Sequence, residues 1–236
     1  MLETLDTSFD FYEDTPTGKD PDAFSPTLRR YHKLLWSKQL PNQTMFELTD
    51  STPNVYLHHK SQLGEFFLAS DAITHTYSRT KRTSGIVGKM DREEVKSFFK
   101  TCSTIGAYIV FPGNKVNGKL TINGARGLNG KIGDRFDLTL ECIRLHYLQG
   151  ESPLSETLKR YSGFFDLFGN FRGYVKFFLL EDLVSECFEK VKFHLPFDDF
   201  TSSPYPSDLG EYNFYKKNVL AFVTARNRRI EGAIST

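Results

Sequence analysis

Residues 105–147 read IGAYIVFPGNKVNGKLTINGARGLNGKIGDRFDLTLECIRLHY, and they contain a strand signal, a glycine-rich run and a helix signal in succession. The first seven residues are apolar, β-branched or aromatic, and Pro112-Gly113 follows them, which predicts a strand over 105–111. In residues 134–147, apolar side chains recur at offsets of 0, 4, 7 and 11 from Phe136. That spacing is one face of a helix. The fold must therefore combine strands and helices.

Outward from this stretch, helix and strand signals continue without strict alternation. Ser25 before Pro26 is a helix cap followed by a residue suited to the first helical position. Asp91 caps a second helix in the same way. The predicted helices are 26–36, 91–102, 154–168, 171–184 and 212–230. The predicted strands are 44–48, 55–58, 65–68 and 191–195, with 120–123 as a hairpin partner of 105–111.

This order of elements predicts an α+β fold rather than a doubly wound α/β fold. We expect a single domain in which a mixed sheet packs against the aromatic-rich helices of residues 154–184. Residues 1–22 are acidic and rich in Thr, Asp and Pro, and are predicted to form an N-terminal arm. The domain proper is then 23–236.

Composition narrows the class of protein. The 236 residues include 22 Phe and 11 Tyr, an ample supply for a core. Thirty basic and 29 acidic residues give a net charge of +1, so nothing drives general attraction to nucleic acid or to an anionic membrane. Three widely spaced cysteines favour a reducing compartment, and no apolar run is long enough to cross a bilayer. We expect a soluble cytoplasmic protein.

The glycine-rich run of residues 117–135 is the first candidate site. Glycine recurs at every third position from Gly124 to Gly133, with basic residues between. Glycines let a backbone approach a ligand closely, and a following helix N-terminus attracts anions. The run fails the phosphate-loop spacing at Ala125 and Ile132, and a plain connection between strand and helix explains it equally. As a binding site, its anion-holding residues would be Arg126, Lys131 and Arg135, with Asn123 orienting the ligand.

The predicted helix that follows carries an acidic ridge. Asp134, Asp137 and Glu141 lie at offsets of 0, 3 and 7. Carboxylates on one face can bind Mg²⁺ or act as acid and base, which makes Asp137 and Glu141 candidate catalytic residues. The same residues also stabilise a helix N-terminus, and Glu141 can pair with Arg144. Mg²⁺ is therefore left open as a cofactor.

Several blocks of sequence together resemble a known family. They are residues 24–38 (FSPTLRRYHKLLWSK), 63–71 (LGEFFLASD), 121–127 (TINGARG) with 134–147, and 193–200 (FHLPFDDF) with 225–230 (ARNRRI). They are similar to a family of uncharacterised bacterial proteins, a domain of unknown function. The resemblance implies a single bacterial domain, and it carries over no activity, cofactor or catalytic residue.

Two classes of function remain open. The first is a cytoplasmic protein that binds a phosphate-bearing ligand, such as a nucleotide or RNA, at residues 123–135, including a toxin or defence enzyme. The second is a non-enzymatic interaction module or homodimer that uses exposed Phe and Tyr side chains. An enzyme should gather the arginines and a carboxylate in one pocket, whereas an interaction module should show a flat aromatic patch.

Overall fold

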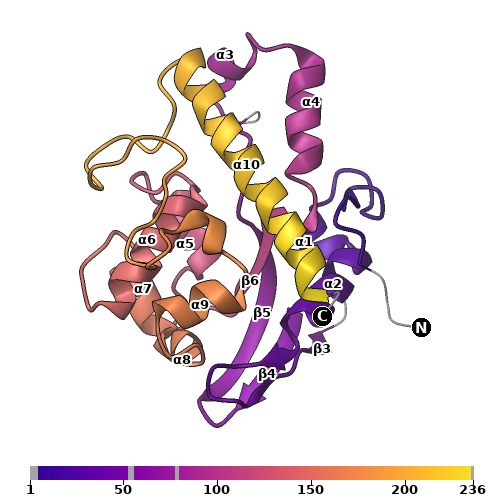
Figure 1. The fold of residues 1–236 in the computed structure, drawn as a ribbon, viewed down its shortest axis with the longest axis vertical. Helices are drawn as coiled ribbons and strands as arrows, with labels where there is room; N and C mark the ends of the chain where they lie inside the picture. Colours follow the sequence, from indigo (N-terminus) through magenta and orange to yellow (C-terminus); the bar gives the residue numbers. More distant parts are fainter. Residues whose placement is uncertain (1–4, 53–55, 78–79, 235–236) are drawn as a thin grey trace.

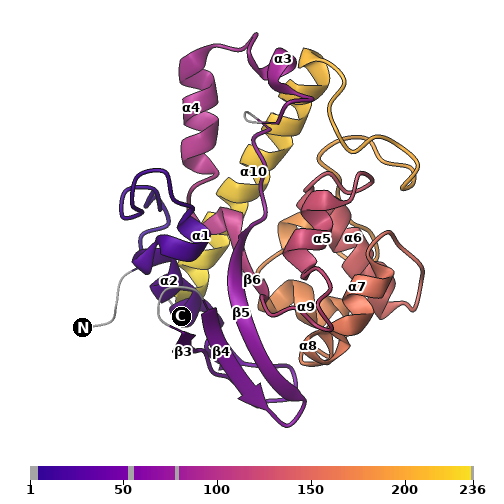
Figure 2. The ribbon, with the colours of Figure 1, turned by 180° about the vertical axis from the view of Figure 1, so that it is seen from behind.

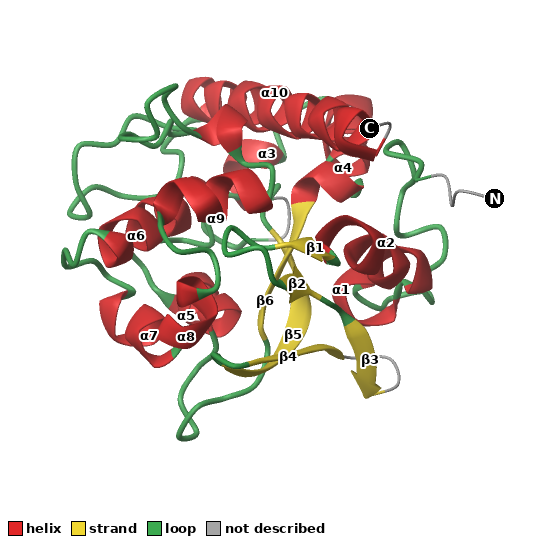
Figure 3. Cartoon of the chain, turned by 60° about the horizontal axis from the view of Figure 1, so that its bottom comes forward, coloured by secondary structure: helices red, strands yellow, loops and turns green. Residues whose placement is uncertain are grey.

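The computed structural model describes residues 5–52, 56–77 and 80–234. Within them the chain forms ten α-helices and two small antiparallel sheets, which confirms the predicted α+β class (Figure 1). Seen from below in Figure 3, the strands lie between α2 on one side and the group α5 to α9 on the other, with α10 across both. No helix among these residues combines the length and apolar character needed to span a membrane.

The larger sheet has the strand order β3-β4-β5-β6. Its first three strands are consecutive in the chain, and β6 returns after α3 and α4 to pair with β5. Every pair in the described residues is antiparallel, where the sequence predicts a mixed sheet. The strands are β1 (Lys38–Gln39), β2 (Met45–Phe46), β3 (Thr49–Thr52), β4 (Tyr56–Ser61), β5 (Gly64–Ala72) and β6 (Tyr108–Pro112).

The helices occupy both sides of this sheet (Figures 1 and 2). The first two belong to the N-terminal part, five lie together on the opposite side, and α10 is the longest. They are α1 (Pro21–Phe24), α2 (Pro26–Trp36), α3 (Ser84–Val87), α4 (Arg92–Thr101), α5 (Ile122–Leu128), α6 (Phe136–Tyr147), α7 (Ser155–Arg160), α8 (Ser162–Asp166), α9 (Phe171–Phe177) and α10 (Leu209–Ile234), with 3-10 turns η1 (Ile105–Ala107) and η2 (Glu181–Leu183).

The predicted caps form at two helices. The Ser25 hydroxyl accepts the backbone N–H of Leu28, and the Asp91 carboxylate accepts the N–H groups of Glu93 and Glu94. Each cap satisfies amides that have no partner within the helix. Helices 26–36 and 92–101 therefore begin where the sequence predicts.

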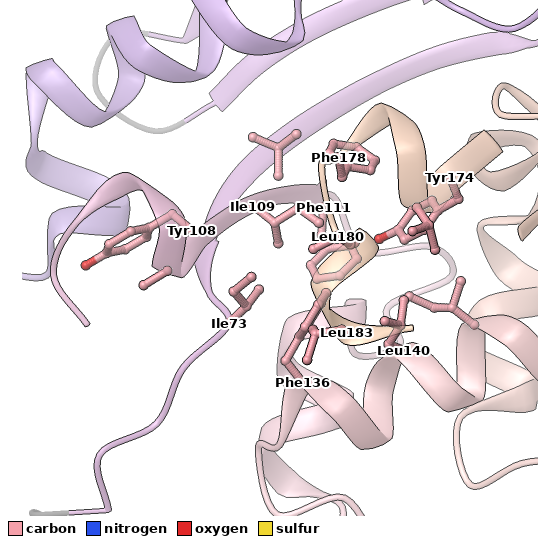
Figure 4. Packing of buried hydrophobic residues seen from close by; sticks show 14 of the residues in the cluster. Ile73, Tyr108, Ile109, Phe111, Phe136, Leu140, Tyr174, Phe178, Leu180 and Leu183 are labelled. Atoms are coloured by element: carbon pink, nitrogen blue, oxygen red, sulfur yellow. The ribbon is translucent and has the colours of Figure 1, made fainter. Parts of the chain in front are cut away.

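The core lies between the sheet and the aromatic helices, as expected. Figure 4 shows Phe136 of α6 and Phe178, just after α9, turned toward Ile109 and Phe111 of β6. All four side chains are at most 1% exposed. Aromatic rings of this size dominate the energy of a core.

The N-terminal segment contributes to that core. Phe11 is fully buried, and its ring packs edge-on against Tyr31 of α2 and Tyr108 of β6. Residues 21–24 form a short helix. The segment predicted as an arm thus brings its carboxylates against the sheet.

Several predicted elements differ in the structure. Residues 120–123 are not a strand, because the Thr121 hydroxyl caps α5 by accepting the N–H of Gly124. Residues 154–168 break into two helices. The predicted helix 171–184 stops at Phe177, since Leu179 has a positive φ of 55°. The predicted strand 191–195 is reduced to one bridge between Val191 and Val184.

A buried arginine joins α10 to the rest of the fold. Arg226 is fully buried and donates to the carbonyls of Gly106 (3.0 Å), Tyr108 (2.8 Å) and Phe178 (2.9 Å). Burial lowers the pKa of Arg226 to about 9. Among the described residues no carboxylate forms an ion pair with this guanidinium. Arg226 therefore stabilises the fold by satisfying three carbonyls from two segments, residues 106–108 and Phe178.

We expect Arg226→Met to destabilise the fold by about 2–4 kcal/mol, because the three buried carbonyls lose their donors. Urea unfolding measures the change. Arg228→Met is the matched control, since Arg228 is exposed on the same helix and should change stability by less than about 0.5 kcal/mol. Equal losses in the two variants would contradict this role for Arg226.

Candidate ligand-binding pocket

The structure places Arg126 in the interior, with 1% of its surface exposed. All three guanidinium nitrogens donate hydrogen bonds: Nη1 to Asp71 Oδ2 and Ala72 O (both 3.1 Å), Nη2 to Asp134 O (2.8 Å) and Nε to Thr139 Oγ1 (3.3 Å). Nη1 also lies 3.0 Å from Asp134 Oδ1. An incoming anion would have to displace these partners.

Arg135 and Asp137 are likewise internal, where they pair with each other. The Asp137 carboxylate accepts from Arg135 and from the backbone N–H of His194 at 2.8 Å. Burial opposes ionisation, but His194 and Arg135 keep the pKa of Asp137 below its usual value. Arg135 also donates to the Pro204 carbonyl at 3.3 Å, so this pair fastens α6 to residues 194–204.

The remaining predicted residues do not converge. Lys131 is exposed, and Glu141 forms hydrogen bonds with Arg144 at 2.8 and 2.6 Å. Asn123 lines a pocket together with Asp134. The carboxylates of the acidic ridge thus face different cations. Across the residues that the structure describes, no group of three or more His, Cys, Asp or Glu side chains could hold a metal ion.

The pocket has a volume of about 320 Å³. Its lining residues include members of α1, α4, α5 and the end of β5. Figure 2 shows α1 and α4 on one side of β5 and α5 on the other. Its walls combine carboxylates, one histidine, aromatic rings and small polar groups. The lining residues are Tyr12, Asp20, Asp22, Asp71, Ala72, Thr74, His75, Thr76, Phe99, Cys102, Ser103, Tyr108, Asn123 and Asp134.

Four aspartates line the pocket: Asp20, Asp22, Asp71 and Asp134. Arg126 pairs with Asp71 and Asp134, and no ion pair reaches Asp20 or Asp22 within the described part of the chain. Burial raises the pKa of Asp71 well above its usual value. Burial and the nearby Asp20 carboxylate raise the pKa of Asp22 to about 7. The pocket therefore holds more carboxyl groups than cations, and a cationic ligand would favour their ionised form.

His75 has a fixed tautomer at the pocket wall. Its Nδ1 accepts the backbone N–H of Tyr77 at 2.8 Å, so the proton of the neutral ring is on Nε2. Nε2 lies 3.7 Å from Asp134 Oδ2. Burial lowers the pKa of His75, and Arg126 lowers it further, against the opposing effect of Asp134. His75 thus presents an N–H donor to Asp134 without adding a positive charge.

Aromatic rings form part of the wall. The rings of Tyr12 and Phe99 lie 5.0 Å apart, and Tyr108 lines the pocket from β6. Ring faces attract cations, most strongly where water is excluded. Rings and carboxylates in one cavity favour an organic cation over a bare, strongly hydrated ion.

The chain belongs to a family of unknown function (DUF6994), which it matches over residues 5–230. This confirms the resemblance to a domain of unknown function. No curated protein and no solved structure matches the chain. The family therefore assigns no activity, and the function has to be inferred from the site.

Sequence reasoning found Asn123 and Asp134 but missed Asp20, Asp22 and Asp71. Asp20 before Pro21 was a usable local signal, because its carboxylate caps α1 by accepting the N–H of Asp22. No local pattern places Asp22 beside Asp71, since the two lie on separate elements far apart in the chain.

We expect Arg126→Met to cost about 3–5 kcal/mol of stability at neutral pH, because it leaves the Asp71 carboxyl buried without its partner. Urea unfolding measures this loss. Lys131→Met, an exposed change nearby, is the control and should be nearly neutral. A neutral result for Arg126→Met would show that the guanidinium is not needed to hold the pocket together.

The pKa of Asp22 predicts a pH dependence of stability. Its value of about 7 in the fold exceeds the reference 3.8, so between these pH values the native state holds a proton that the unfolded state releases. Stability attributable to Asp22 therefore falls as pH rises from about 4 to about 7. Asp22→Asn should flatten this decline in urea unfolding series, whereas Asp198→Asn, an exposed loop change, should not. Parallel curves for Asp22→Asn and wild type would contradict the assignment.

Proposed function

We propose that the chain is a cytoplasmic bacterial protein that binds a small organic cation, an amine or a guanidinium compound, in the pocket between α1, β5 and α5. The observation that carries the proposal is the set of four aspartates on one cavity, where the nearby guanidinium of Arg126 is already committed to Asp71 and Asp134. A ligand cation would compensate the carboxylates that Arg126 does not reach.

The detailed geometry supports this proposal. Asp22 Oδ1 is shielded from solvent and accepts no hydrogen bond within the described residues. A buried acceptor without a donor is costly, and a ligand N–H would satisfy it. Tyr12 and Phe99 would cover the apolar part of the ligand. Affinity would come from charge-assisted hydrogen bonds and ring contacts together.

A phosphate-bearing ligand, such as a nucleotide or RNA, stays the second candidate. Lys131 is exposed within the glycine-rich run, and Asn123 reaches the pocket. Against it, the two predicted anion-binding arginines are engaged by Asp71, Asp134 and Asp137. A toxin or defence enzyme acting on RNA would rest on this second candidate.

The interaction-module alternative would need an apolar face. Among the described residues, the exposed large aromatic side chains are Tyr12, Phe24 and Phe214. Tyr12 precedes α1, Phe24 ends α1, and Phe214 lies on α10. These few positions give weaker support for a docking surface than the pocket gives for a ligand.

The test is a thermal-shift panel of methylguanidine, putrescine, tetramethylammonium, inorganic phosphate and ATP with and without Mg²⁺. A ligand at about 100 times its dissociation constant adds about 2.7 kcal/mol, which for a chain of this size raises the Tm by roughly 5 to 10 °C. We expect the rise with methylguanidine or putrescine and not with phosphate or ATP.

The matched variants are Asp20→Asn and Asp198→Asn, which remove one carboxylate charge in the pocket and one on a distant exposed loop. Asparagine can still cap α1, so Asp20→Asn should keep the fold and weaken the cation-induced shift. A shift with phosphate or ATP alone would favour the second candidate. No shift with any cation would contradict the proposed function.

A further inference from the structure

A line of buried polar groups leads from α2 to the floor of the pocket. The indole Nε1 of Trp36 donates to His32 Nδ1 at 3.0 Å, and His32 Nε2 lies 2.9 Å from the hydroxyl of Ser70 on β5. Trp36 is fully buried and His32 is 1% exposed. Ser70 in turn interacts with the carboxyl of Asp22.

The direction of these bonds follows from chemistry. An indole N–H only donates, so His32 Nδ1 must carry a lone pair. Burial and the neighbouring Arg226 lower the pKa of His32 to about 3, so the ring is neutral. Its proton is therefore on Nε2 and is donated to Ser70 Oγ.

The Ser70 hydroxyl then has one proton left to donate. Because its oxygen already accepts from His32, that proton is available to the Asp22 carboxyl. The main-chain N–H of Ala72, on the same strand, also interacts with this carboxyl. Ser70 and Ala72 both belong to β5, and Oδ1 of the Asp22 carboxyl accepts no hydrogen bond among the described residues.

We propose that His32 and Ser70 are positioning residues that hold the Asp22 carboxyl as a hydrogen-bond acceptor in the pocket. In the series of bonds from Trp36 through His32 to Ser70, the last group is the Ser70 hydroxyl, whose remaining proton can be donated only to an acceptor. The role of this arrangement in binding rests on the proposed function, in which the Asp22 carboxyl accepts a hydrogen bond from the ligand's N–H. The arrangement itself, a directed line of donors toward Asp22, can be measured without any ligand.

Other charged and titratable groups also affect the ionisation of Asp22, and the variants proposed below leave them unchanged. Asp20 at the start of α1 and Asp71 on β5 disfavour its ionisation, and Arg126 on α5 favours it. Tyr108 of β6 also faces it. None of these side chains is changed in the variants below.

The experiment is an NMR titration of the Asp22 carboxyl carbon in the ligand-free protein, on wild type, Ser70→Ala and Ser70→Thr. Loss of one hydrogen bond to the carboxylate should move the Ser70→Ala midpoint to higher pH by about one pH unit. Ser70→Thr keeps the hydroxyl and should titrate like wild type. Ser97→Ala, an exposed change on α4, is the control for a serine removed elsewhere.

An unchanged midpoint in folded Ser70→Ala protein would overturn the inference. So would nitrogen chemical shifts that place the His32 proton on Nδ1. His32→Leu should reproduce the shift seen with Ser70→Ala. If the midpoint moves as expected but no cation binds in the thermal-shift panel, the line of donors stands and the proposed ligand fails.

Discussion

The guanidinium of Arg126 is the interaction on which the rest of the structure depends. It ties Asp71 and Ala72 at the end of β5 to Asp134 and to Thr139 of α6. The sheet and the helical group are thereby joined through one buried charge. Removing a partner from such a buried pair is costly, because it leaves a buried charge without compensation.

The same arrangement gives the pocket its chemistry. Arg126 forms ion pairs with Asp71 and Asp134, while Asp20 and Asp22 line the pocket from the N-terminal segment. Carboxylates outnumber cations around the cavity, so the field inside it favours positive charge. Three arginines are buried among the described residues, and all three bond to internal groups: Arg126 to Asp71, Arg135 to Asp137 and Arg226 to carbonyls.

Local signals in the sequence predicted what depends on local chemistry. The caps at Ser25 and Asp91 and the apolar face of α6 are confirmed, because neighbouring residues determine them. The predicted strand at 120–123 is wrong, since glycine spacing does not reveal that Thr121 caps a helix there. The sequence singled out Arg126 and Arg135 as residues that bind a ligand anion, whereas in the structure they pair with Asp71 and Asp137. An arginine can bind a ligand anion or pair with a buried aspartate of the protein itself. Which of the two occurs depends on contacts between segments distant in the chain, such as Asp71 with Arg126, and residue spacing does not predict such contacts.

The most direct test of the account is a crystal structure of the protein grown with guanidinium, compared with one grown with phosphate. We expect a guanidinium ion within hydrogen-bonding distance of Asp22, between the carboxylates and the rings of Tyr12 and Phe99. Phosphate should leave the bonds of Arg126 to Asp71 and Asp134 intact. A phosphate ion bound to Arg126, with those bonds broken and the guanidinium pocket empty, would contradict it.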